Sequence, residues 1–544
     1  MQHQRTTEPT RPARRESLTR LSLPILLLGC GACGPPAAQL PNVLLISLDS
    51  VRADELSFRD NTISPRMTEL ARAGTTFRRT LSGSSWTLPA HVQMFTGQPP
   101  SLHGVQIDQH KIDAATRTLP ECLRDAGYYT AGIWSGWYLA GEYGYARGMT
   151  RYDCAMTLNA EAEQALADAR QVGGQVAQIA EIRREQTSHR DITSQRIVER
   201  ARVALGEVSA EDPVFLFAHF FDPHYDYTPP APYDTAFDPE YDGPLDGRDF
   251  WSDLRIFDAT QTPPRQIEER DLEHIRALYR GEIAWTDQAV GQLLDAFEEA
   301  GRLDNTIVII TADHGEEFFE HGNRGHRQSL YEEVLRVPLL IVPPANAHGT
   351  SATCDMLTSL SDLMPTILEM IGQPLPKGVY GRSLVPLLTG KSLPARPLLS
   401  SLAVVGRSGT ETSSSRVMEC LTTENEKLTR VLSVAPDGSA TLEQLAFTDL
   451  ASDPGEMRPR VNPANARLRA TWDALEAESS RMRQFQLGLE RSPAEERRTN
   501  VKTLFAAELG ALGYAEGGEV DANEYPLIPW SLSPLPPIPY PVRD

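Results

Sequence analysis

The sequence predicts an α/β fold with a doubly wound, mostly parallel central sheet flanked by helices, followed by a smaller C-terminal α+β subdomain. Between about residues 41 and 375, short and nearly unbroken apolar runs alternate with amphipathic stretches. This pattern is typical of strands that are buried on both faces of a parallel sheet, with helices between them. After about residue 376 the apolar segments follow one another closely, which indicates antiparallel strands. The 544-residue length also favours more than one structural unit.

The apolar runs that we assign to the parallel sheet are residues 43–48, 129–134, 214–220, 306–311 and 337–342. One predicted helix buries the face formed by Ile197, Ala201, Ala204 and Leu205. Another buries Val290, Leu293, Leu294 and Phe297, and Gly301 is placed to end it. In such a fold the active site lies at the carboxyl ends of the strands, so polar residues there are the first candidates for function.

The region from 376 to 512 is the predicted C-terminal subdomain. Its β-type segments cover residues 398–405, 416–421, 427–434 and 442–450. A Pro436-Asp437-Gly438 turn joins the last two as a hairpin. A helix is predicted near 463–490. Residues 513–544 form a Pro-rich tail that we expect to be extended or disordered.

Residues 1–29 have the features of an export signal. Five arginines precede a short apolar run over residues 21–28, which is too short to span a bilayer. The sequence Leu27-Leu28-Gly29-Cys30 is similar to a lipobox, in which the Cys30 thiol is acylated after cleavage. We therefore expect an exported bacterial lipoprotein, anchored on the periplasmic or cell-surface side, with a linker over 30–40. An ordinary signal peptide followed by a chance cysteine is the alternative.

The formal net charge of -21 argues against nucleic acid or an anionic membrane surface as the main partner. The only membrane contact that we expect is the lipid anchor at Cys30. A small anionic substrate is not excluded, because a bound metal ion can reverse the local electric field. The five remaining cysteines have no metal-ligand spacing and define no disulfide framework.

Three chemically suggestive positions follow from the predicted elements. Asp49 comes directly after the first apolar run, and Asp313-His314 come after another. Two strand ends can hold such side chains rigidly around one cation. Thr87 begins a helical pattern with Pro89 in its first turn, where the helix dipole favours an alkoxide. Taken alone, Asp49 or Thr87 has a simpler interpretation as a residue that only caps a helix.

The order of the motifs resembles the sulfatase family of the alkaline-phosphatase superfamily. The matching segments are VLLISLDSVRAD, SSWTLPAHVQMFTG, HFFDPHYDYTPP, DNTIVIITADHGEEFFEHG, LYEEVLRVPLLI, SLSDLMPTILEMIG and LAFTDLASDPGE, which together extend over about residues 41–455. The resemblance implies an alkaline-phosphatase-like catalytic domain over 41–375. It also implies a metal site at Asp49, Asp313 and His314, a nucleophile at Thr87, and an active-site histidine at His224. His326 lies near the position of a sulfatase lysine that assists the leaving group.

The sequence departs from the sulfatase pattern around the nucleophile. The segment Thr87-Leu88-Pro89-Ala90-His91 stands where sulfatases have C/S-x-P-S-R. Threonine cannot become the formylglycine that sulfatases use, and His91 replaces the arginine. Ser50 replaces a second aspartate, His314 replaces an asparagine, and residues 133–141 lack the usual lysine and histidine. We therefore expect Thr87 to be the direct nucleophile, with His91, His224 and His326 as the other catalytic residues.

The implied metal ligands are Asp49, Thr87, Asp313 and His314, which are three oxygen donors and one imidazole. This set favours one Mn or Zn ion over Ca, which remains an alternative although it prefers more ligands that are all oxygen. A second ion at Asp222, His224 and His326 is a further alternative.

The leading hypothesis is a metal-dependent hydrolase that acts outside the cytoplasm on a phosphate or sulfate ester. The substrate would be a small anionic ester, either free or carried on a glycan or lipid. One alternative is a transferase that passes a phosphoryl-bearing group to an alcohol of the cell envelope. The other is a non-catalytic lipoprotein that binds anions or glycans. Retention of Asp49, Thr87, Asp313 and His314 together argues for an enzyme.

Overall fold

The computed structural model describes residues 39–498, apart from 60–61, 157–190, 252, 259–260, 262–263, 347–351, 406–414, 436–439 and 463. The predicted signal peptide, Cys30, most of the linker, the Pro436-Asp437-Gly438 turn and the Pro-rich tail therefore lie outside the described residues. The chain divides into two compact units, Met1–Gln39 and Leu40–Asp544, and every element named below belongs to the second.

Among the described residues, the central sheet has nine strands in the order β12-β2-β11-β8-β1-β5-β3-β4, with β13 also paired to β2. The strands are β1 (Asn42–Leu48), β2 (Thr75–Leu81), β3 (Tyr129–Trp134), β4 (Arg151–Cys154), β5 (Val214–Phe220), β8 (Thr306–Ala312), β11 (Arg336–Val342), β12 (Ala352–Cys354) and β13 (Thr358–Ser359). Every residue of β1, β5 and β8 is buried, as their apolar sequences require.

The predicted mostly parallel sheet is confirmed, and all five predicted strands are present. Strand β1 runs parallel to both β5 and β8, and β3 runs parallel to β5. Strand β11 is the exception, because it runs antiparallel to both β2 and β8. An apolar run shows burial but not direction, so the sequence could not reveal this. Strand β2 escaped prediction because Arg78 and Arg79 interrupt its apolar residues.

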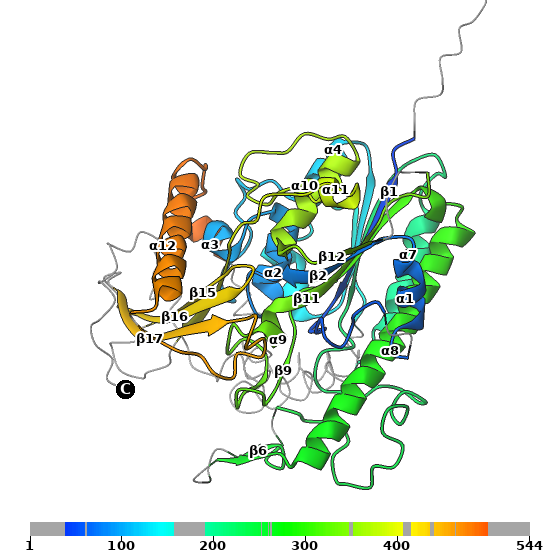
Figure 1. Cartoon of the computed structure of the whole chain (residues 1–544). Coiled ribbons are helices and arrows are strands. Elements are labelled where there is room, and N and C mark those ends of the chain that lie inside the picture. Colours follow the sequence, from blue (N-terminus) through cyan, green and yellow to red (C-terminus); the bar gives the residue numbers. More distant parts are fainter. Residues whose placement is uncertain are drawn as a thin grey trace, which may run out of the picture. The chain divides into compact units, whose positions relative to one another are not determined.

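Helices cover both faces of the sheet (Figure 1). On one face lie α1 (Pro65–Ala71), α7 (Ser194–Gly206) and α8 (Glu269–Glu299), and α8 packs against both of the others. On the other lie α2 (Thr87–Thr96), α4 (Leu119–Asp125) and α10 (Leu363–Met370). The predicted apolar faces of α7 and α8 are buried, and Gly301 follows α8 with a φ of 67°. Shorter elements are α3 (Pro100–His103), α9 (Glu332–Leu335), α11 (Val385–Leu388), β6 (Phe257–Asp258), β7 (Arg265–Gln266), β9 (Glu317–Phe318) and β10 (Arg324–Gly325).

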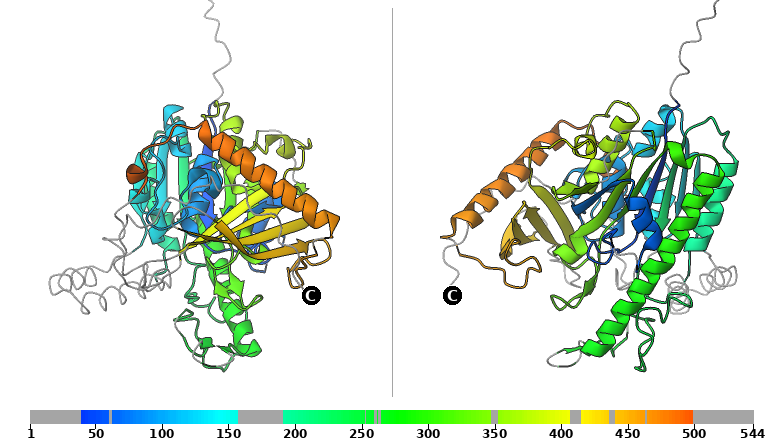
Figure 2. Two further views of the ribbon diagram at one scale, coloured as in Figure 1. Left: turned by 90° about the vertical axis from the view of Figure 1, so that its left-hand side faces the viewer. Right: turned by 45° about the vertical axis from the view of Figure 1, so that its right-hand side comes forward.

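The C-terminal part is an antiparallel sheet with one long helix on it (Figure 2), as predicted. Its strands are β14 (Leu398–Val405), β15 (Ser415–Thr422), β16 (Glu426–Val434) and β17 (Ala440–Asp449), and its helix is α12 (Ala466–Leu487). Leu468 and Leu475 of α12 are buried in a cluster with residues of β15 and β16. Hydrogen bonds from Ser400 and Ser401 to the carbonyl groups of Ser82 and Gly83 attach this sheet to the segment before Thr87.

No helix in the described part of the chain is both long enough and apolar enough to cross a membrane.

Candidate active site

Two carboxylates meet where adjacent parallel strands end. Leu48 of β1 pairs with Ala312 of β8, so the next residues, Asp49 and Asp313, lie side by side. Both side chains are completely buried. The convergence expected from the two strand ends is therefore present in the structure.

Ser50 holds these two carboxylates in place. Its backbone N–H donates to Asp313 Oδ1 at 3.1 Å, and its hydroxyl donates to Asp49 Oδ1 at 2.8 Å. Ser50 has a φ of 58°, a left-handed conformation that is uncommon for a residue with a side chain. Ser50, which stands where sulfatases have a second aspartate, thus links Asp49 and Asp313.

His314 completes the group predicted at the strand ends. Its Nδ1 lies 2.9 Å from the Gly315 carbonyl oxygen, which can only accept, so Nδ1 carries the proton. A neutral ring then has its lone pair on Nε2. This atom lies 3.4 Å from Asp313 Oδ2, 3.7 Å from Asp49 Oδ1 and 3.4 Å from the Thr87 hydroxyl oxygen. All four side chains predicted as metal ligands therefore converge.

The arrangement fits a divalent cation. Asp49 Oδ2 and Asp313 Oδ2 are buried and make no hydrogen bond within the described residues. Burial, and then the charge of Asp49, raise the pKa of Asp313 well above its ordinary value. Two ionised carboxylates in such a site need a compensating positive charge. Distances of 3.4 to 3.7 Å between the donor atoms are close to the ~3.4 Å edge of a tetrahedral zinc site.

Thr87 is the first residue of α2, and Trp86 occupies the N-cap position. No side-chain hydrogen bond caps this helix, so the alternative in which Thr87 is only an N-cap is wrong. The next described helix after Asp49 begins at Pro65, so Asp49 is not a helix cap either. Thr87, only 4% exposed, therefore lies at the positive end of the α2 dipole, with its hydroxyl oxygen 3.4 Å from His314 Nε2.

His91 has a different environment from the one expected of a residue that contacts substrate. Its Nδ1 lies 2.9 Å from the Thr87 carbonyl oxygen and 3.6 Å from Asp313 Oδ2. Its Nε2 lies 2.9 Å from the Ser47 hydroxyl. Both ring nitrogens are thus engaged inside the protein. We therefore assign His91 a positioning role, in which it orients Thr87 and Asp313.

The rings of His224 and His326 lie close to His314. The ring centres of His326 and His314 are 4.3 Å apart, and those of His326 and His224 are 5.0 Å apart. Burial lowers the pKa of His224 to about 3 and that of His326 well below its ordinary value. Both imidazoles are therefore neutral near pH 7. The structure thus places His326 beside His314, and His224 beside His326.

Glu316 supports His326 and was missed in the sequence, although it stands two residues after His314. Its Oε1 shares a 2.9 Å hydrogen bond with His326 Nδ1, and Tyr227 donates to its Oε2 at 3.1 Å. Burial raises the pKa of Glu316 to about 8. The hydrogen bond fixes the orientation of the His326 ring.

The second metal site suggested at Asp222, His224 and His326 would have no carboxylate ligand, because Asp222 is hydrogen-bonded elsewhere. Asp222 accepts hydrogen bonds from Thr193 N, Thr193 Oγ1 and Ser194 N at the start of α7, and from Trp285 Nε1. These four donors use both carboxylate oxygens. Asp222 thus binds the start of α7 and Trp285 of α8. The prediction that it is a metal ligand is wrong.

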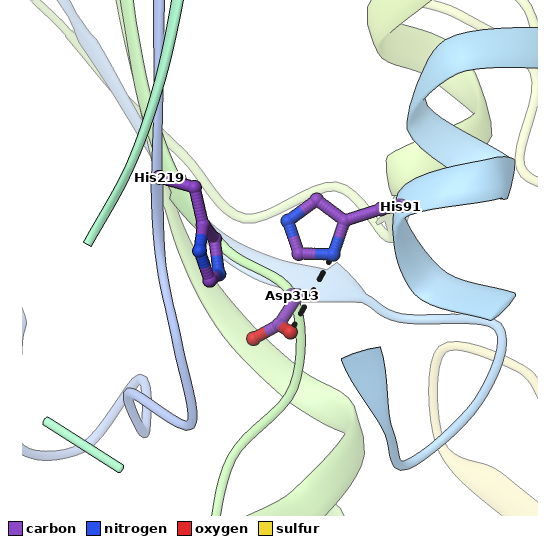
Figure 3. A group of neighbouring side chains, drawn as sticks. All are labelled: His91, His219 and Asp313. Atoms are coloured by element: carbon purple, nitrogen blue, oxygen red, sulfur yellow. Dashed lines mark ion pairs between the residues drawn. The ribbon is translucent and has the colours of Figure 1, made fainter. Parts of the chain in front are cut away.

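Two other residues near the site were missed. His219, near the end of β5, is completely buried beside Asp49, and Figure 3 shows it facing His91 and Asp313. A histidine inside the apolar run VFLFAHF was the available signal. The Arg327 guanidinium lies 4.0 Å from the centre of the Trp86 ring, next to Thr87, and donates to the Tyr138 hydroxyl at 3.0 Å. It brings a positive charge to the neighbourhood of Thr87.

The chain is similar in sequence to known sulfatases. The chain is 31% identical to arylsulfatase K of Xenopus laevis over 216 residues, which are 38% of each protein. It is 25% identical over 383 residues to arylsulfatase K of Rattus norvegicus, covering 65% of this chain and 64% of that protein. A choline-sulfatase of Rhizobium meliloti (strain 1021) also shares 25% over 383 residues, covering 64% and 72%. The chain thus matches less than two thirds of either arylsulfatase K.

Solved structures show the same fold. A phosphonate monoester hydrolase of Agrobacterium radiobacter has a TM-score of 0.60 at 21% identity, over 82% of this chain and 96% of that one. A protein in complex with its substrate D-glucosamine-2-N,6-O-disulfate has a TM-score of 0.62 at 19% identity, over 82% and 99%. The family model described as Sulfatase matches residues 41–373, more than half of the chain. The chain therefore belongs to the sulfatase family.

Proposed function

We propose that this protein is a metal-dependent ester hydrolase in which Thr87 attacks a phosphate or sulfate ester directly. The observation that carries the proposal is the position of the Thr87 hydroxyl. It lies at the N-terminus of α2, 3.4 Å from His314 Nε2 and next to two buried carboxylates. The relatives named above, which act on sulfate or phosphonate esters by name, support a small anionic ester as the substrate.

Asp49, Asp313, His314 and Thr87 would hold the cation, which supplies positive charge that lowers the pKa of the Thr87 hydroxyl. Zn or Mn suits this mixed donor set better than Ca. Asp49 and Asp313 are oriented by Ser50, and His91 holds the Thr87 carbonyl and therefore the first turn of α2.

The reaction follows from these positions. Thr87 Oγ1, having lost its proton, forms a bond to phosphorus or sulfur, and the bond from that atom to the alcohol oxygen breaks. Because both imidazoles start neutral, His326 or His224 takes up the proton that Thr87 loses and then donates it to the departing alcohol oxygen. Water then cleaves the threonine ester, which restores the Thr87 hydroxyl and releases the inorganic anion. Arg327, beside Trp86, is placed to attract the anionic group.

The test compares kcat/KM for matched aryl phosphate and aryl sulfate esters, with protein from a host that lacks a formylglycine-generating enzyme. We expect activity without that enzyme and faster turnover of the phosphate. Threonine has no geminal diol with which to expel sulfate, whereas phospho-threonine is open to attack by water. A preference for the sulfate would contradict the proposal. Transfer to an added alcohol in place of water would favour the transferase, and metal binding without any turnover would favour the binding protein.

We also propose that the protein is exported and anchored through an acylated Cys30. The support is the Leu27-Leu28-Gly29-Cys30 sequence after a basic and apolar start. Mass spectrometry of the mature protein should find residue 30 at the N-terminus with its lipid mass. Cys30→Ala should abolish the modification, and the matched variant Cys33→Ala should leave it unchanged. A mature N-terminus downstream of Cys30 would refute the anchor.

A further inference from the structure

His219 lies against the proposed metal centre, although its sequence position did not mark it as a ligand. It belongs to β5, which runs parallel to β1, and it pairs with Ser47, two residues before Asp49. The His219 side chain is completely buried, and its Nε2 lies 3.3 Å from Asp49 Oδ2. His219, His91 and Asp313 form one group whose donor atoms lie within 4.8 Å of one another, and Asp49, Asp313 and His314 form a second group, so Asp313 belongs to both. The imidazole therefore lies near both carboxylates.

The hydrogen bond between His219 and Ser135 determines which nitrogen of the His219 ring carries the lone pair. His219 Nδ1 lies 2.6 Å from the Ser135 carbonyl oxygen. A carbonyl only accepts, so Nδ1 carries a proton, and a neutral ring has its lone pair on Nε2. Hydrogen bonding of one ring nitrogen to a carbonyl, with the other nitrogen on the metal, is the usual arrangement of a histidine ligand.

Two unsatisfied atoms consequently face each other. Within the described residues, neither His219 Nε2 nor Asp49 Oδ2 makes a hydrogen bond, even though they are only 3.3 Å apart. An imidazolium N–H aimed at the carboxylate would satisfy both atoms, but the pair lacks hydrogen-bond geometry. A cation bound by both atoms is the other solution. Adjacent ligands about 2.1 Å from a five-coordinate zinc ion lie roughly 3 to 3.6 Å apart, a range that includes the observed distance.

His91 is the natural comparison, because its ring is 4.9 Å from that of His219 (Figure 3). Its Nδ1 contacts the Thr87 carbonyl and its Nε2 contacts the Ser47 hydroxyl. Of these two imidazoles, His219 alone faces the carboxylates with a nitrogen that is not already hydrogen-bonded.

We propose that His219 is a metal ligand through Nε2, in addition to Asp49, Asp313, His314 and Thr87. The inference rests on the metal centre of the proposed function but not on the nucleophilic role of Thr87. A second imidazole makes the site richer in nitrogen, which strengthens the preference for zinc over calcium.

The experiment measures the Kd for Zn²⁺ by titration of the metal-free full-length protein with a competing chelator. We expect His219→Ala and His219→Phe to weaken zinc binding by more than about 100-fold, beyond the 10- to 100-fold loss typical of an outer-shell residue. The phenylalanine variant retains a ring of similar size, so its loss would reflect the missing nitrogen. The control is His103→Ala, which removes another buried histidine whose ring contacts the Pro89 carbonyl and Val105 N. The control should bind zinc with the wild-type Kd.

Unchanged or tighter zinc binding by the His219 variants would overturn the inference, because it would show that His219 is only an ion-pair partner of Asp49. X-ray absorption of the zinc-loaded wild type gives an answer even if the variants do not fold. Two imidazole ligands would support the inference, and one would overturn it. If the wild type itself binds no divalent ion, the metal centre fails as a whole. If the wild type binds zinc and only the His219 effect is absent, the proposed hydrolase stands and this inference fails.

Discussion

Replacing Thr87 with alanine should lower kcat/KM for an aryl phosphate by about 10⁴-fold or more, as removal of a covalent nucleophile does in other hydrolases. The substitution removes the only atom of this side chain that can form the threonine ester. It should also remove a proposed metal ligand. Thr87→Ser should retain part of the activity, because the hydroxyl remains and only the methyl group is lost.

A matched control separates this effect from damage to the helix. Thr96 lies at the other end of α2, is also buried, and donates its hydroxyl to the Val92 carbonyl. Thr96→Ala should therefore change kcat/KM only slightly. Acid-quenched wild type, analysed by mass spectrometry during turnover, should carry a phosphoryl group on the peptide that contains Thr87. A fully active Thr87→Ala variant would show that another group performs the attack.

Replacing Asp313 should remove the metal ion and the activity together. Its Oδ1 accepts hydrogen bonds from Ser50 N and His314 N, and its Oδ2 is the unsatisfied atom that faces His314 Nε2. Asp313→Asn retains an oxygen for the two N–H groups but loses the negative charge. We expect this variant to fold, to lose the bound ion, and to lose at least about 10³-fold in kcat/KM, since the cation supplies most of the charge stabilisation.

The control for Asp313 is Asp287 of α8. This aspartate is also buried and also accepts from two backbone N–H groups, those of Arg66 and Met67. Asp287→Asn should retain the metal and most of the activity. Elemental analysis of the purified proteins and kcat/KM with and without added Zn or Mn measure both effects. An Asp313→Asn variant that is fully active after metal removal would show that the centre is not required.

The strand positions could be predicted because complete burial has a simple effect on sequence. Strands β1, β5 and β8 lie at the centre of the sheet, where both faces exclude water, so their sequences are almost continuously apolar. Residues that directly follow such strands, Asp49 and Asp313, must lie near the carboxyl edge. Strand β2 lies nearer the edge of the sheet and has exposed and half-buried arginines, so its sequence is not continuously apolar.

The role of each polar side chain depended on partners that are distant in the sequence. Asp222 is a candidate ligand by sequence, but its oxygens accept hydrogen bonds from the start of α7 and from Trp285. His91 has both ring nitrogens engaged by Ser47 and Thr87, which leaves it a positioning role.

By itself, the sequence determined the fold class and the strands that carry the site, and it predicted the set Asp49, Thr87, Asp313 and His314, whose side chains the structure brings together. These follow from patterns that are local along the chain. Only the tertiary structure decided that β11 runs antiparallel, and that His219 lies beside Asp49 with Nδ1 bound to Ser135. The physical reason is that a histidine can bind a metal only through a nitrogen that has no other partner. Its partners come from separate strands and loops, which only folding brings together.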